Sequence, residues 1–246
     1  MVIPIYDNDP LERKSNRPYV TFTLIAINIA VFSFVSATSD NVATQILVNF
    51  ALFPVAVSGE AITGGFVPPS LSLVTYMFLH GGWLHVLFNM LFLFVFGDNI
   101  EDALGHGRFL AFYLLCGIAG GAAHTVMAPL SNIPLVGASG AIAGVIAAYM
   151  MIRPCARITV LIFGFIPITL ASYWVLGFWT LTQVWHVFSL DKSDTAWWAH
   201  VGGLAAGAIL IVVMRPPGIP LFQCFSPEDA IALAESRSSG PWGRPR

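Results

Sequence analysis

Apolar runs that are long enough to cross a lipid bilayer recur along this chain, and they restrict its fold more than any other feature. A helix needs about 20 apolar residues to span the hydrocarbon core. Because backbone polar groups must be bonded within that core, several such runs favour a bundle of membrane helices. The six expected spans are residues 19–35, 71 or 82 to 100, 108–128, 139–152, 167–187 and 196–214.

The composition separates this chain from soluble domains and from several other classes of protein. Of its 246 residues, 57% are hydrophobic and 10% are charged, and the mean hydropathy is +0.77, which is typical of an integral membrane protein. The net charge of -2 gives no basic excess for binding nucleic acid. The three cysteines, Cys116, Cys155 and Cys224, are widely spaced and odd in number, so they suggest neither a disulfide framework nor a zinc cluster.

Positive charges lie almost entirely on one side of the predicted bundle. Six spans place both termini on the same side, which holds every Lys and Arg of the 11 except Lys192. Because cytoplasmic flanks retain positive charge, we expect an N-in, C-in topology. The predicted fold class is an all-α membrane protein, a six-transmembrane-helix bundle formed by residues 18–215. Residues 1–17 are expected to form a short cytoplasmic segment, and residues 216–246 a mobile cytoplasmic tail.

Two regions between the spans are less simple. Residues 36–70 combine apolar patches with acidic residues and with pairs of Gly and Pro, and they predict a long loop with interfacial pieces. Residues 157–190 form an apolar stretch longer than one crossing needs, interrupted by Gly164, Pro167 and Gly177. We place the fifth span at residues 167–187 of this stretch.

His85 and Asn89 are polar residues inside the second apolar segment. They are four positions apart, so in a helix they lie on one face. Such residues are costly in hydrocarbon, and they usually face the bundle interior or a water-filled cavity and mark a functional site. We therefore expect both side chains to point toward a functional centre.

Four polar side chains share one depth in the predicted bundle. The second, fourth and sixth spans all start on the outer side. Ser139 is the first residue of the fourth span, His200 lies about four residues into the sixth, and His85 and Asn89 lie in the first turns of the second. At about 1.5 Å per residue, all four lie within roughly 10 Å of the outer edge.

Small residues follow both Ser139 and His200, at the four-residue spacing that lets membrane helices approach closely. These pairs are Gly140 and Gly144, and Gly203 and Gly207. Each pattern alone is typical of helix packing, and a lone membrane histidine is typical of a satisfied interior residue. Their coincidence at one depth indicates a serine nucleophile with a histidine base, which need a separation of about 2.6–3.2 Å.

Three motifs in this order resemble those of the rhomboid intramembrane serine proteases. They are H-x4-H-x3-N at His80, His85 and Asn89, G-A-S-G at residues 137–140, and A-H-x2-G-x3-G at residues 199–207. The resemblance covers residues 18–215, and the three motifs together are highly specific.

The resemblance implies a serine endopeptidase that hydrolyses peptide bonds in or near transmembrane segments of membrane-protein substrates. Ser139 would be the nucleophile, His200 the general base, and His85, Asn89 and the backbone N–H of Ser139 the oxyanion hole. Residues of the same motifs would support the site: His80, Gly137, Gly140, Gly203 and Gly207. No acidic third member, cofactor or metal is expected. The implied location is a prokaryotic plasma or inner membrane, with the active site toward the outer face and the lipid bilayer as surroundings.

Other positions extend the resemblance or depart from it. Glu101 and Gly105 match an acidic residue and a glycine that the family has beyond the second span. The family commonly has an aromatic residue one turn after the nucleophile, against which the base packs, and this chain has Ala143. A Trp-Arg pair often found in the long first loop is missing from residues 36–79. The sequence therefore does not predict which residues orient His200 or which residues anchor the long first loop.

Two other functions are alternatives. A catalytically inactive rhomboid relative would bind membrane proteins without cutting them, and the intact Ser139 and His200 argue against it. A polytopic transporter, or a haem or metal protein, would use the histidines of the chain: His80, His85, His124, His186 and His200. The sequence has no H-E-x-x-H motif, no clustered carboxylates and no visible inverted repeat, which argues against this class.

Overall fold

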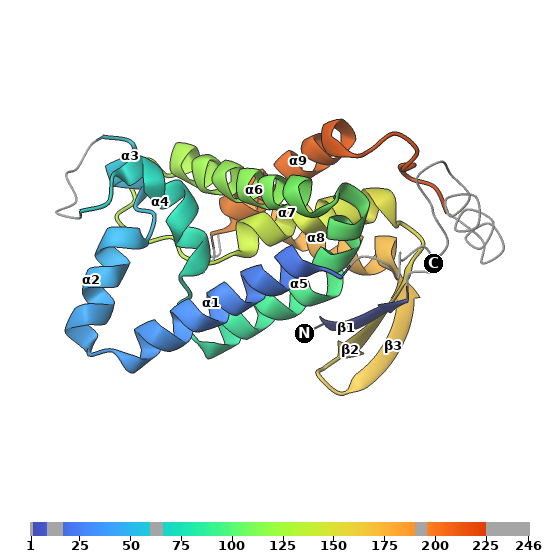
Figure 1. The fold of residues 1–246 in the computed structure, drawn as a ribbon, viewed down its shortest axis with the longest axis horizontal. Helices are drawn as coiled ribbons and strands as arrows, with labels where there is room; N and C mark the ends of the chain where they lie inside the picture. The colour runs from blue at the N-terminus through green and yellow to red at the C-terminus, as the bar shows by residue number, and fades with distance from the viewer. Residues whose placement is uncertain (1, 9–16, 60–65, 190–195, 225–246) are drawn as a thin grey trace.

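The computed structural model describes residues 2–8, 17–59, 66–189 and 196–224, and most of these are helical (Figure 1). Four helices among them are long and apolar enough to cross a membrane: α1 (Tyr19–Ala37), α5 (Trp83–Leu104), α6 (His106–Met127) and α9 (Trp197–Met214). A shorter apolar helix, α7 (Ser139–Ile152), runs over the residues predicted for the fourth span. α8 (Ser172–Phe188) has 17 residues and completes the bundle.

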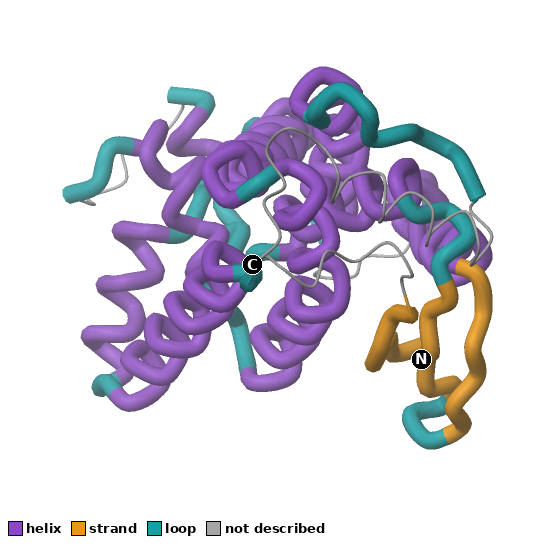
Figure 2. Tube along the Cα trace, turned by 45° about the vertical axis from the view of Figure 1, so that its right-hand side comes forward, coloured by secondary structure: helices purple, strands orange, loops and turns teal. Residues whose placement is uncertain are grey.

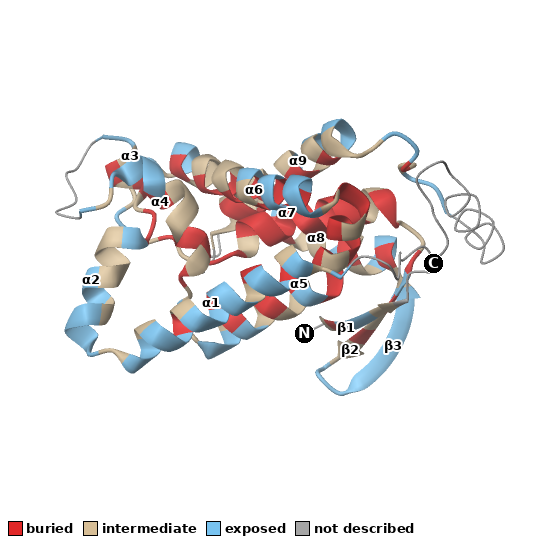
Figure 3. Ribbon diagram, viewed as in Figure 1, coloured by how far each residue is buried: buried red, intermediate tan, exposed pale blue. Residues whose placement is uncertain are grey.

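α7 lies at the centre of the bundle, and nearly all of its residues are buried (Figure 3). Its sequence, SGAIAGVIAAYMMI, combines small residues that allow close approach with large apolar residues that fill the remaining space. Phe96 of α5 meets Tyr149 of α7 edge-on, with ring centroids 5.0 Å apart. Because α7 is apolar on every face, it is buried by neighbouring helices on every side.

Glycines bring the backbones of α7 and α9 into direct contact. A methyl group added at Gly203 would overlap the carbonyl oxygen of Gly140, and one added at Gly207 would overlap that of Gly144. No larger residue fits at either position without moving a helix. The small residues that follow Ser139 and His200 therefore set the distance between α7 and α9.

A buried carboxylate holds the start of α1 against the end of α5. Glu101, which is 2% exposed, accepts hydrogen bonds from the backbone N–H groups of Val20 and Thr21 at 2.9 and 2.7 Å. It also accepts one from the Thr21 hydroxyl at 2.7 Å, and His106 Nδ1 lies 2.5 Å from it. The first N–H groups of a helix lack partners within the helix, so a negative charge there stabilises it.

The connection between α1 and α5 is more helical than the long loop predicted for residues 36–70. It contains α2 (Asp40–Phe50), α3 (Pro54–Val57), α4 (Pro69–Thr75) and the 3-10 turn η1 (Tyr76–Phe78). The loop prediction was wrong because α3 and α4 begin with a proline, which is favourable in the first helical turn but is also typical of loops. Backbone hydrogen bonds between Leu52 and Leu135 tie this connection to the segment before α7.

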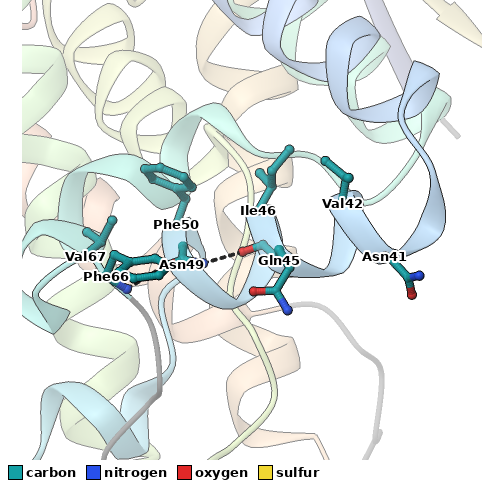
Figure 4. Close-up of a pocket in the computed structure, with 8 residues that line it drawn as sticks. All are labelled: Asn41, Val42, Gln45, Ile46, Asn49, Phe50, Phe66 and Val67. Carbon is teal, nitrogen blue, oxygen red and sulfur yellow. Dashed lines mark hydrogen bonds between the residues drawn. The ribbon is translucent and has the colours of Figure 1, made fainter.

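A groove of about 340 Å³ lies beside α2 (Figure 4). Asn49 on its wall donates to the carbonyl oxygen of Gln45 at 2.7 Å and accepts from the backbone N–H of Phe66 at 2.6 Å. The lining is made of Asn, Gln, Val, Ile and Phe side chains. Its described lining residues include no Ser, His, Cys, Asp or Glu, and therefore offer no group for nucleophilic or acid–base chemistry.

A three-stranded antiparallel sheet lies at one end of the bundle (Figure 2). Its strands, in spatial order, are β1 (Val2–Asn8), β2 (Arg157–Ile162) and β3 (Ile166–Ala171). Asp7 of β1 accepts hydrogen bonds from Asn99 Nδ2 at 2.9 Å and from the Tyr149 hydroxyl at 2.8 Å, which joins the sheet to α5 and α7. The prediction of an all-α fold was wrong for these residues.

The fifth span was also predicted to begin too early. Residues 166–171 form β3, and α8 starts only at Ser172. The hairpin between β2 and β3 turns at Gly164, whose φ of +85° suits glycine. Its strands are apolar at most positions, and a short apolar run does not by itself distinguish a strand from a buried helix. The prediction from apolar length therefore included the residues of β3 in the fifth span.

The first part of the expected tail packs against the end of α7. The backbone N–H of Phe222 donates to the carbonyl oxygen of Met151 at 2.7 Å, and Ile219 is buried. A disulfide joins Cys155 to Cys224, whose Cα atoms are 5.3 Å apart. The spacing of the cysteines gave no indication of this single disulfide, because residues 69 positions apart meet only through the fold. The remainder of the predicted tail, residues 225–246, lies outside the described residues.

Candidate active site

Ser139 and His200 meet between the N-terminal ends of α7 and α9. His200 Nε2 lies 2.8 Å from Ser139 Oγ, which is within the reach that a base and its nucleophile require. Ser139 is the first residue of α7, and His200 lies in the first turn of α9. His200 is buried and Ser139 is half-buried. An unprotonated Nε2 at this distance can remove the hydroxyl proton as the serine attacks an electrophile.

α6 packs against both of the helices that carry this pair. A methyl group added at Gly120 of α6 would lie 2.7 Å from the carbonyl oxygen of Ala199 and 3.4 Å from the Cα atom of Gly140. Ala199 precedes the histidine and Gly140 follows the serine. The sequence analysis gave α6 no role, although its own run of small residues, G-I-A-G-G at 117–121, was a visible signal for close packing.

His85 and Asn89 converge beside Gly137, two residues before the serine. Gly137 has a φ of +122°, a backbone conformation that favours glycine. A methyl group added there would lie 2.7 Å from His85 Nε2 and 3.6 Å from Asn89 Nδ2. Both nitrogens therefore border the backbone that leads into α7, and an alanine at this position would be strained and would displace them.

The hydrogen bonds of these residues determine which atoms they offer to a ligand. Asn89 Nδ2 is buried and finds no acceptor within the part of the chain that the structure describes. The backbone N–H of Gly81 points to His85 Nδ1 at 3.4 Å, so the neutral ring carries its proton on Nε2. The N–H of Ser139 belongs to the first turn of α7 and has no partner within that helix. These three donors can stabilise an anion beside Ser139.

His80 lies against the other side of His85. The two rings are edge-to-face, with centroids 5.1 Å apart. Burial lowers the pKa of His80 to about 3, and the neighbouring His85 is the second cause. His80 is therefore neutral near pH 7, and it supports the His85 ring by packing rather than by charge.

Three side chains around His200 were missed by the sequence analysis. Gln183 of α8 places its Oε1 atom 2.7 Å from His200 Nδ1. The rings of Trp179 and Trp197 lie 6.1 and 5.9 Å from the His200 ring, measured between centroids. These two rings flank the histidine, whereas Ala143 offers it no aromatic surface. Trp179 of α8 and Trp197 of α9 therefore provide the aromatic contacts to His200 that Ala143 cannot provide.

Gln183 carried a signal that the sequence analysis did not use. It is an amide inside an apolar helix, and in the structure it is only 4% exposed. The rule that selected Asn89, that polar residues in hydrocarbon mark functional centres, applies equally to Gln183. The contact of Trp197 with His200 depends on how α8 and α9 pack, which the sequence does not specify.

A comparison with known protein families matches residues 69–217 to the rhomboid domain. The matched segment is more than half of the chain and contains the helices that carry Ser139, His200, His85 and Asn89. The chain belongs to the rhomboid family. This confirms the resemblance drawn from the three motifs, and it makes this rhomboid an integral, multi-pass membrane protein.

This rhomboid is similar to curated relatives from bacteria and yeast. It is 31% identical to Rhomboid protease GluP of Bacillus subtilis over 204 residues, 83% of this chain and 36% of the relative. It is 32% identical to Rhomboid protease AarA of Providencia stuartii over 142 residues, 52% of this chain and 49% of the relative. With Rhomboid protein 1, mitochondrial, of Saccharomyces cerevisiae, identity is 25% over 202 residues, 80% of this chain and 53% of the relative. The chain thus spans about a third to a half of these relatives' length.

Proposed function

We propose that this rhomboid is an intramembrane serine endopeptidase that hydrolyses peptide bonds in or near transmembrane segments of other membrane proteins. Ser139 is the nucleophile and His200 is the general base. The observation that carries this proposal is the 2.8 Å separation of Ser139 Oγ and His200 Nε2 between two glycine-packed helices. A reactive pair held by direct backbone contact is positioned before substrate arrives.

The first step forms an acyl-enzyme. Ser139 Oγ attacks the carbonyl carbon of the substrate while His200 Nε2 takes the hydroxyl proton, and the carbonyl oxygen becomes an oxyanion. His85 Nε2, Asn89 Nδ2 and the backbone N–H of Ser139 donate hydrogen bonds to that oxyanion. When the C–N bond breaks, the imidazolium gives its proton to the departing amine.

The second step consumes one water molecule. His200 Nε2 removes a proton from the water as its oxygen attacks the acyl carbon, and the same three donors stabilise the second oxyanion. Collapse breaks the bond to Ser139 Oγ, which takes back the proton from His200. The products are a new carboxyl end and a new amino end of the substrate, and the enzyme returns to its starting state.

We further propose a six-span, N-in, C-in arrangement of the membrane domain at residues 18–215, with α7 and α8 as the fourth and fifth spans. The asymmetry of Lys and Arg supports it, and it puts Ser139 near the outer face. A reporter enzyme fused after Met214 should score as cytoplasmic. An external score would reverse the orientation and place the serine in the other leaflet.

Substrates are expected to be transmembrane segments with residues that loosen a helix. The peptide carbonyls of a regular helix are bonded and shielded by side chains, so a local break is needed before Ser139 reaches one. The test is incubation of wild type and Ser139→Ala with a panel of single-span membrane proteins. The proposal predicts cleavage by wild type alone. Identical product patterns would instead support an inactive relative that binds membrane proteins.

A further inference from the structure

The catalytic histidine has a second hydrogen-bond partner on α8, a helix that lies at the edge of the bundle. His200 Nδ1 is 2.7 Å from Gln183 Oε1, and His200 Nε2 is 2.8 Å from Ser139 Oγ. Three helices thus contribute to one chain of hydrogen bonds. Gln183 is 4% exposed although only three of the 17 residues of α8 are buried, so its amide is directed into the bundle.

The orientation of the Gln183 amide follows from its second contact. Gln183 Nε2 donates to the carbonyl oxygen of Trp179 at 3.1 Å and to the Thr182 hydroxyl at 3.0 Å. A backbone carbonyl has no hydrogen to donate, so the NH2 group must face it. The flipped amide would put two acceptor oxygens against each other. Oε1 is therefore the atom that faces His200.

This orientation determines where the proton of His200 resides. An amide oxygen only accepts hydrogen bonds, so a contact of 2.7 Å requires the hydrogen to be on His200 Nδ1. A neutral imidazole has one N–H, which leaves Nε2 with a free lone pair directed at Ser139 Oγ. The opposite tautomer would place a hydrogen between Nε2 and the serine and leave no base.

We propose that Gln183 is a positioning residue, which holds His200 in the Nδ1–H tautomer and in the orientation that lets Nε2 accept the Ser139 proton. This inference rests on the proposed function. In place of the acidic third member of other serine proteases, the chain uses a neutral amide. A buried carboxylate surrounded by apolar helices would carry a high desolvation cost, whereas an amide supplies the same acceptor without a charge.

Gln183 also links catalysis to the position of α8. Its reach is limited to the length of one side chain, so the bond to His200 persists only while α8 packs beside α9. Trp179, one turn earlier on α8, packs near the same ring. A displacement of α8 away from α9 would therefore release Nδ1 and remove two of the groups that orient His200.

Nitrogen NMR of wild type, with 15N-labelled histidine, tests the tautomer directly. The His200 signals are assigned by their loss in His200→Ala. Well above the pH at which the ring protonates, the inference predicts a protonated Nδ1 and an unprotonated Nε2. In Gln183→Met, which keeps the length and volume of the side chain, the Nε2–H form should become populated. An Nε2–H tautomer in wild type would overturn the inference without any measurement of activity.

Kinetics test the functional consequence. Mutation of the partner that orients a metal-bound histidine typically lowers metal affinity or activity by about 10–100-fold. We expect a factor of the same size for the partner of His200. Gln183→Met should lower kcat by that factor and leave KM close to wild type, because Gln183 is only 4% exposed and contacts His200 at Nδ1, away from Ser139. Gln183→Glu keeps an acceptor of the same reach and should recover part of the loss. The control Gln45→Met makes the same change on the exposed face of α2 and should cleave at the wild-type rate.

The outcomes separate this inference from the proposed function. Cleavage by wild type and by Gln183→Met at equal rates overturns the role of Gln183 and leaves Ser139 and His200 in place. Absence of Ser139-dependent cleavage by wild type overturns the proposed function, and the NMR result still decides the tautomer. If Gln183→Met does not fold, the His200 tautomer measured in wild type is by itself the test of the inference.

Discussion

α7 and α8 both supply a residue to the same hydrogen-bonded chain, but they are held in different ways. Eleven of the 14 residues of α7 are buried, compared with Ser172, Leu176 and Gln183 among the 17 of α8. Gly144 of α7 is pressed against Gly207 of α9, whereas a methyl group added at Gly177 of α8 would meet nothing within 4 Å. Ser139 lies on the most enclosed of these helices, and Gln183, the partner of His200, lies on an outer one.

The difference indicates a division of tasks. Backbone contact among α6, α7 and α9 fixes the separation of Ser139 and His200, because such contacts have no flexible side chain to yield. α8 follows β3 without a loop, and its buried residues are limited to Ser172, Leu176 and Gln183. The distance between Ser139 and His200 therefore depends on glycines, and the orientation of His200 depends on an amide.

Gly203→Ala should disrupt the close contact between α7 and α9 and have the largest effect on stability. The added methyl group overlaps the Gly140 carbonyl, so α7 and α9 must separate and the protein should lose about 3 kcal/mol or more of stability. Unfolding in detergent measures the loss. Gly177→Ala on α8 is the matched control, and it should be neutral or stabilise by up to about 1 kcal/mol, because alanine favours helix. Equal effects of the two substitutions would contradict the comparison.

Asn89→Ala should act on turnover rather than on folding. Its buried Nδ2 is one of the donors beside Ser139, and a donor aimed at an oxyanion stabilises the transition state more than the bound substrate. Loss of one such donor costs on the order of 100-fold to 1,000-fold in kcat, about 3 to 4 kcal/mol. Ser139 of this variant should still react with a fluorophosphonate probe. Wild-type turnover in a folded variant would mean that Asn89 is an interior polar residue with no part in turnover.

Ser172→Ala should have a smaller effect and sharpens the account of α8. The Ser172 hydroxyl shares its one hydrogen between the carbonyl oxygens of Arg153 and Pro154, the latter at 2.7 Å, and this ties the start of α8 to the end of α7. Removal of a buried hydrogen bond costs about 1 to 3 kcal/mol. We expect a lower unfolding midpoint, with kcat reduced less than in Gln183→Met. A larger loss of kcat than in Gln183→Met would mean that the start of α8 controls the histidine more than Gln183 does.

Apolar length and motif spacing predicted the parts of this molecule that depend on local sequence. α7 begins at Ser139 and ends before Pro154, because a polar start and a proline enclose a uniformly apolar run. α5 keeps His85 and Asn89 on one face because helical spacing fixes it. Depth along parallel helices was enough to group these residues with Ser139 and His200.

The remaining features depend on contacts that are distant in sequence. The apolar composition of residues 157–171 is compatible with both a strand and a membrane helix. These residues form strands because β2 pairs with β1 and with β3. Gln183 reaches His200 only because α8 starts at Ser172 and packs beside α9. The pairing of Cys155 with Cys224 likewise follows from the packing of residues after α9.

Mapping of a covalent adduct tests the central claim most directly, that Ser139 is a nucleophile activated by His200. A fluorophosphonate reacts with activated serines, and mass spectrometry of the labelled protein locates the modified residue. We predict a single adduct on Ser139 in wild type and none in His200→Ala at the same probe concentration and time. An adduct at another residue, or equal labelling of Ser139 with and without His200, would contradict the account.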